Sequence, residues 1–203
     1  MNLVAGRKWI TLLFNPFVYV AGGQALGLGV AVIFVAGLAG FVSHTHFDGV
    51  LDTHVGSSAS ATFFLAEGFI DWLSLALVLL VLGKMVSKTS FRIIDVLGTQ
   101  ALARWPTIFL ALITLPPAFQ RYNHVLVEQV TRNPLQPPPI SPDAIYFFAV
   151  ALLMLPLLIW MIALMYNAYS ISCNVRGAKA VATFTVGVIL AEILSKFIIY
   201  ALR

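Results

Sequence analysis

Long apolar runs separated by short polar segments dominate the chain. Residues 25–42, 61–82, 144–166 and 178–202 each form such a run, with few or no charged side chains. A helix of about 20 apolar residues crosses the hydrocarbon core of a bilayer. The pattern therefore predicts four membrane-spanning helices. The first of them is rich in glycine, with a G-x-x-x-G pair at Gly23 and Gly27, which favours close packing at the centre of a bundle.

A fifth apolar piece, residues 105–115, is shorter than the others. As a helix it would be about 17 Å long, at 1.5 Å per residue. The hydrocarbon core is about 30 Å thick, so this piece cannot cross it alone. Residues 91–104, just before it, are amphipathic. Either the span begins there and kinks near Pro106, which gives five spans, or the piece is re-entrant, which gives four.

The segments outside these runs predict two further features. Residues 7–20 combine the basic pair Arg7 and Lys8 with aromatic side chains, a mixture typical of a short helix in the headgroup region. Residues 118–143 are polar and rich in proline, which predicts an extended, irregular connector. The expected fold is an all-α membrane protein. A single domain, residues 1–203, holds five transmembrane helices, an interfacial N-terminal helix and a kinked or partly re-entrant third segment.

Composition supports a membrane protein and argues against nucleic-acid binding. Hydrophobic residues make up 60% of the chain and charged residues 10%, whereas soluble domains carry about 25% charged residues. Five spans place most of the 12 basic residues on one side: Arg7, Lys8, Lys84, Lys88, Arg92, Arg104, Arg176 and Lys179. The positive-inside rule makes that side, with the N-terminus, cytoplasmic and the loop of residues 44–54 external. Four spans fit the charges equally well.

Three stretches resemble the Yip (Ypt-interacting-protein) domain family. They are G-K-M-V-S-K-T-S-F-R-I-I-D-V-L-G-T-Q-A-L-A-R-W-P (83–106), W-M-I-A-L-M-Y-N-A-Y-S-I-S-C-N-V-R-G-A-K-A-V (160–181) and L-L-F-N-P-F (12–17). The resemblance covers nearly the whole chain, and its motifs are structural, not catalytic. It implies five spans and a cytosolic N-terminus. Eukaryotic members bind Rab-type GTPases partly through a long N-terminal region. Only a short stretch precedes Pro16, so the resemblance favours a bacterial inner-membrane member without that role.

The loop of residues 44–54, H-T-H-F-D-G-V-L-D-T-H, is unusually rich in metal-ligating side chains. In an extended backbone, alternate side chains share one face. Gly49 would permit a turn that brings the second half back towards the first. Imidazole and carboxylate are ligands of divalent metals such as zinc. The candidate ligands are His44, His46, Asp48, Asp52 and His54; the alternative is a solvated polar loop without a metal.

Four charged residues lie inside the apolar runs, away from their cytoplasmic ends. Glu67 and Asp71 share one helical face, and the last run carries Glu192 and Lys196. Matched depths predict that the second and fifth spans are neighbours. They also predict that Glu67 pairs with Lys196, and that Asp71 faces Glu192, sharing a proton or a cation. The alternative is a static polar clamp between helices.

The remaining candidates are weaker. The basic residues Lys84, Lys88 and Arg92 suit anionic lipid headgroups, although such residues also serve as simple topological signals. Cys173 is the only cysteine, which excludes an intrachain disulfide. No cleavable signal, nucleophile signature or phosphate-binding glycine loop is evident. The sequence thus favours a non-enzymatic scaffold that contacts the bilayer and other membrane proteins or a second copy. The alternatives are a cation or proton transporter and a metal-dependent membrane enzyme.

Overall fold

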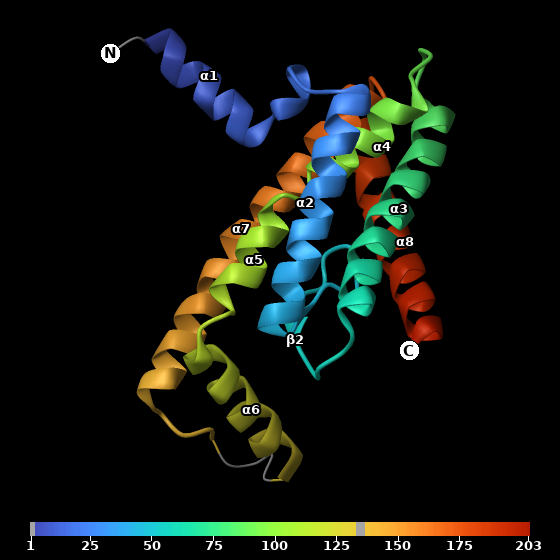
Figure 1. Ribbon diagram of the computed structural model, residues 1–203. Coiled ribbons are helices and arrows are strands. Elements are labelled where there is room, and N and C mark those ends of the chain that lie inside the picture. The colour runs from blue at the N-terminus through green and yellow to red at the C-terminus, as the bar shows by residue number, and fades with distance from the viewer. Residues whose placement is uncertain (1–2, 133–136) are drawn as a thin grey trace.

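A computed structural model describes residues 3–132 and 137–203, with side chains from residue 9 onward. In these ranges the regular secondary structure is helical except for a two-stranded hairpin (Figure 1). In chain order the elements are α1 (Leu3–Phe14), the 3-10 turn η1 (Pro16–Val18), α2 (Gly22–Ser43), β1 (Thr45–His46), β2 (His54–Val55), α3 (Ala61–Val86), α4 (Ile93–Leu102), α5 (Pro106–Ile113), α6 (Pro117–Arg132), α7 (Pro142–Ser172) and α8 (Gly177–Leu202).

Five segments are long and apolar enough to cross a membrane, as the sequence predicted. Four are the single helices α2, α3, α7 and α8, and the fifth is Ile93–Ile113. That third span consists of α4 and α5, separated by a turn at residues 103–105. The amphipathic stretch therefore belongs to the same apolar segment as residues 105–115. Whether this segment crosses fully or re-enters stays a prediction.

Glycine lets α2 and α4 approach closely. A Cβ at Gly29 would collide with Ala101 and the backbone of Leu102, and a Cβ at Gly98 would lie 2.6 Å from the Gly22 carbonyl oxygen. The prediction that small residues on the first span serve close packing is thus correct. The particular pair Gly23 and Gly27 is not the contact, because a Cβ at Gly27 would meet open space.

The predicted irregular connector at residues 118–143 is wrong in its first half, which forms α6. Pro117 stands at the start of this helix, where its missing N–H and fixed φ cost little. Phe119 and Tyr122 face α7, and both rings lie within 5.4 Å of the Phe147 ring, centroid to centroid. The other prolines of the predicted connector follow residue 132, and residues 133–136 lie outside the described ranges.

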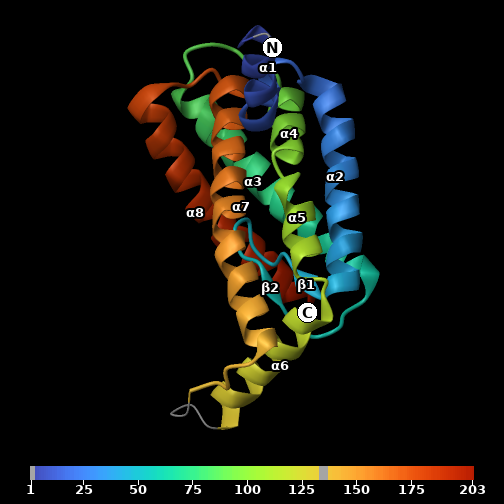
Figure 2. The same cartoon turned by 90° about the vertical axis from the view of Figure 1, so that its left-hand side faces the viewer.

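The spans alternate in direction, so the connections gather at two ends (Figures 1 and 2). The β1–β2 hairpin, α6 and the last turn of α8 lie at one end, called here the hairpin end. The α3–α4 and α7–α8 connections lie at the other. Figure 2 shows α7 running beside α4 and α5, which it contacts. At this opposite end α1 is tied to α7, since Trp160 donates a hydrogen bond to the Leu13 carbonyl (3.0 Å).

Candidate functional site

The loop between α2 and α3 folds back onto the end of the bundle. Helix α2 terminates at His44, whose φ of 52° is left-handed. The two short strands then pair antiparallel, with His46 opposite His54. Phe47 and Val50 are buried. The loop is therefore a structured cap with an apolar underside, and the alternative of a solvated polar loop without a metal stays open.

Helix α8 anchors the tip of this loop. The Leu51 N–H donates to Glu192 Oε2 (3.0 Å), and a Cβ at Gly49 would collide with the Glu192 carboxylate. Lys196 Nζ lies 2.6 Å from Asp52 Oδ2 and 3.2 Å from Glu192 Oε1. Glycine at position 49 thus lets the loop lie against the Glu192 and Lys196 side chains of α8, and no positive φ is involved.

His46 forms the buried centre of the hairpin end. Its Nδ1 lies 2.9 Å from Glu67 Oε1 on α3, and its Nε2 lies 2.9 Å from the Ser57 carbonyl oxygen. Glu67 also accepts from the Phe47 N–H (3.3 Å) and faces Arg203 Nη2 at 3.5 Å. Every partner of Glu67 is a donor and both partners of His46 are acceptors. The geometry therefore fits an imidazole that donates from both ring nitrogens, to Glu67 and to the Ser57 carbonyl.

The pKa of His46 agrees with this assignment. Burial alone would lower the pKa, because it disfavours the charged ring. The hydrogen bonds to Glu67 and to the Ser57 carbonyl, together with the negative charge of Glu67, outweigh burial and raise the pKa above its ordinary value. His46 consequently stays protonated to a higher pH than a histidine with an ordinary pKa does.

A second buried pair lies deeper in the bundle. Arg104 Nη2 is 3.2 Å from Asp71 Oδ2, and both side chains are at most 3% exposed. Arg104 belongs to the turn between α4 and α5, so that break in the third span carries the guanidinium to α3. Sequence reasoning had placed Arg104 at the cytoplasmic surface, which is wrong. Its proximity to Trp105-Pro106, a helix interruption inside an apolar segment, was the available signal.

The predicted pairs between α3 and α8 are corrected accordingly. The two helices are neighbours, as predicted. Glu67, however, pairs with His46 and Arg203 instead of Lys196, and Asp71 hydrogen-bonds Arg104. Matching depths along ideal helices missed three basic partners: Arg104 from the α4–α5 turn, His46 from the hairpin and Arg203 after the last turn of α8. Whether Glu67, Asp71, Glu192 and Lys196 act as a clamp or an ion site stays a prediction.

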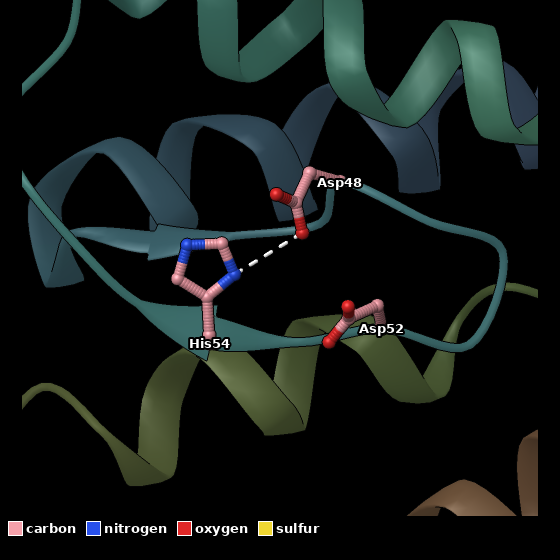
Figure 3. Close-up of side chains that lie close together, drawn as sticks. All are labelled: Asp48, Asp52 and His54. Atoms are coloured by element: carbon pink, nitrogen blue, oxygen red, sulfur yellow. Dashed lines mark ion pairs between the residues drawn. The ribbon is translucent and has the colours of Figure 1, made fainter. Parts of the chain in front are cut away.

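The candidate metal ligands separate into two groups. Asp48, Asp52 and His54 lie together, each offering one ligand atom within 4.8 Å of the others (Figure 3). The two remaining histidines do not join them. Both ring nitrogens of His46 are engaged, and His44 caps α2 instead of lying in an extended strand. The expected shared face of residues 44, 46 and 48 is therefore wrong.

An open pocket of about 380 Å³ adjoins this cluster. It is lined by polar and apolar side chains of the hairpin, the start of α3 and the end of α8, among them His46, His54, Ser57, Ser60, Phe63 and Arg203. Arg203 lies over the Phe63 ring, 5.7 Å from its centroid. Its guanidinium also contacts Asp48 Oδ2 at 3.1 Å, so it joins the buried pair to the carboxylate cluster.

The three basic residues proposed for lipid headgroups lie at the opposite end, and all are exposed. Arg92 is held by Asp95 through two hydrogen bonds of 3.0 Å. Lys88 lines a separate pocket of about 290 Å³ with Arg176 and Lys179. The sequence placed these two residues on the same side as Lys88 but did not include them in the lipid site. Lipid binding there stays a prediction.

Comparison with known proteins yields no match for this chain, whether with family models, with curated proteins or with solved structures.

Proposed function

We propose that this chain is a multi-pass membrane protein of the Yip type that acts as a non-enzymatic scaffold for other membrane proteins. The observation that carries this proposal is the internal pairing of the ionisable groups in its apolar segments. Asp71 pairs with Arg104, Glu67 with His46 and Arg203, and Glu192 with Lys196.

Pairing of this kind suits a fixed architecture. Intramembrane charges are costly, and they persist where they pair or face water. A carboxylate that carries cations must exchange them, whereas the guanidinium of Arg104 already occupies that position at Asp71. Two of the pairings also join different segments: Asp71–Arg104 joins α3 to the α4–α5 turn, and Glu67 joins α3 to the hairpin and to Arg203 after α8. The charges thus determine which elements pack together.

For orientation, we propose a bacterial inner membrane with the hairpin end outside and the N-terminus in the cytoplasm. Support comes from the end opposite the hairpin, which carries Lys84, Lys88, Arg92, Arg176 and Lys179 around the α3–α4 and α7–α8 connections. Arg104 lies in the bundle interior and no longer counts among these basic residues, but most of the others still lie at this end. A single-cysteine variant at Ser58, with Cys173 changed to Ala, should react with a membrane-impermeant maleimide in intact cells. Labelling only after lysis would reverse the orientation.

A second candidate, a proton path, is favoured by unmet hydrogen-bonding capacity in the bundle interior. Within residues 3–132 and 137–203, the buried atoms Asp71 Oδ1 and Arg104 Nη1 have no hydrogen-bond partner. A cavity of about 10 Å³ beside Arg104 approaches the size that one water needs. A chain of such waters would be required to reach either surface.

Flux measurements in proteoliposomes distinguish the two candidates. Purified protein is reconstituted around a pH-sensitive dye, and a potassium gradient with valinomycin supplies the voltage. The scaffold proposal predicts dye responses equal to those of protein-free liposomes, for the wild type and for Asp71→Asn. Proton flux in the wild type above that of protein-free liposomes would replace the scaffold with the proton path.

A further inference from the structure

We propose that Asp48, Asp52 and His54 form a binding site for one divalent transition-metal ion such as Zn²⁺. The site lies on the solvent side of the hairpin, apart from the buried pairs that support the scaffold proposal. Metal binding and scaffold function can therefore fail independently.

The hairpin fold brings the three ligands together. Asp48 follows β1 closely, His54 begins β2, and Asp52 precedes it by two residues. In a four-coordinate zinc site with bonds of about 2.0–2.2 Å, ligand atoms lie about 3.3–3.5 Å apart. His54 Nδ1 and Asp48 Oδ1 already lie 3.1 Å apart, and Figure 3 shows Asp52 beside them. Only the Asp52 carboxylate, whose ligand atom lies within 4.8 Å of the other two, has to move closer to reach this spacing.

The contact between His54 and Asp48 is itself informative. His54 Nδ1 is the ion-pair partner of Asp48 Oδ1 at 3.1 Å, and in the described part of the chain this buried oxygen has no further partner. A cation placed between the imidazole nitrogen and this oxygen would satisfy both, with His54 binding as the neutral ring.

Basic side chains orient the two carboxylates. Arg203 contacts Oδ2 of Asp48 at 3.1 Å, and Lys196 contacts Oδ2 of Asp52 at 2.6 Å. Each aspartate therefore binds its cation through one oxygen and retains Oδ1 as a metal ligand. Partners of this kind fix the orientation of ligating groups. Nearby carboxylates (Asp48, Asp52, Glu67 and Glu192) outnumber the cations (His46, Lys196 and Arg203), so a divalent ion remains electrostatically favoured.

The site is open to solvent. The side chains of His54 and Asp52 are 43% and 40% exposed, and His54 borders the 380 Å³ pocket. Three protein ligands leave at least one coordination position for water or an incoming ligand. The metal would enter from the aqueous phase without opening the bundle.

Isothermal titration of tag-free protein in detergent with ZnCl₂ tests the proposal. One Zn²⁺ should bind per chain, and His54→Ala and Asp52→Asn should each weaken binding more than tenfold, because even indirect ligand partners cost about 10–100-fold. His44→Ala is the matched control and should bind as the wild type does. Co²⁺ should give visible absorption bands in the wild type and not in Asp52→Asn. If His54→Ala fails to fold, Asp52→Asn, a change at a half-exposed residue, decides the outcome.

Several results would overturn the site. Absence of stoichiometric binding is one, and equal loss in His44→Ala and His54→Ala is another. Unchanged affinity in folded Asp52→Asn would also reject the three-ligand geometry. None of these results would bear on flux in proteoliposomes, so the scaffold proposal would stand or fall separately.

Discussion

Asp71 on α3 and Arg104 in the turn between α4 and α5 form a fully buried ion pair with an N–O distance of 3.2 Å. The pair joins the second span to the only described span that consists of two helices. Neither residue is close to the other in sequence, and each would be an uncompensated charge without its partner. The break in the third span therefore positions the guanidinium of Arg104 to pair with Asp71 on α3.

We expect Asp71→Asn to destabilise the protein by about 3–5 kcal/mol, because removing one partner of a buried pair leaves the other charge unpaired. Replacing both, as Asp71→Asn with Arg104→Met, should restore much of the loss. Unfolding in mixed micelles with increasing SDS measures both variants. Arg132→Met is the control, since Arg132 pairs with Glu128 on the surface of α6, and its effect should be small. Additive losses in the double variant would mean that the two residues are not coupled.

The apolar segments of this fold were predictable because the bilayer imposes them. Residues that face lipid must be apolar over a length fixed by the membrane, whatever the neighbours of each helix are. The glycines of α2 likewise predicted close packing, because small residues let two helix backbones approach each other. The sequence could not show which glycines make that contact, because the crossing point depends on how α4 is placed.

The polar partners were less predictable, and the reason is physical. Pairing of Glu67 depends on the hairpin, which carries His46 back over α3, and on Arg203 after α8. Neither contact of Glu67, with His46 or with Arg203, follows from a regular spacing of residues in the sequence. Helix α6 was missed because the prolines on both sides of residues 118–132 outweighed the apolar positions Phe119 and Tyr122. In the metal cluster, the ligand types were evident, but the hairpin register decided that His54 joins Asp48 and that His46 does not.

Close packing of α2 against α4 gives a second prediction. Gly29→Ala should destabilise the protein by about 1–3 kcal/mol, since a Cβ there would overlap Ala101 and the Leu102 backbone. Gly27→Ala is a matched control on the same helix: its Cβ would meet open space, and alanine favours the helix by about 0.5–1 kcal/mol. Thermal unfolding in detergent should give a lower Tm for Gly29→Ala than for the wild type, and no decrease for Gly27→Ala. Equal Tm values would show that α2 and α4 do not cross at Gly29.

The His46–Glu67 pair predicts a pH dependence of stability. Because the folded-state pKa of His46 is raised, its stabilising contribution is fully present below the ordinary histidine value of 6.5. That contribution is lost as the pH rises through the higher pKa of the folded state. With EDTA present, Tm should therefore decrease as the pH is raised from about 6 towards 9, by about 2–4 °C for each kcal/mol of lost stability in a chain of this size.

His46→Gln isolates this effect, because glutamine keeps a hydrogen-bonding group but does not titrate in this range. Its Tm should be lower than that of the wild type at pH 6, and the difference should shrink as the pH increases. The control, His124→Gln, changes an exposed histidine on α6 and should leave the slope of Tm against pH unchanged. A wild-type slope that persists in His46→Gln would assign the titration to another group, and the imidazolium at the centre of the hairpin end would have to be abandoned.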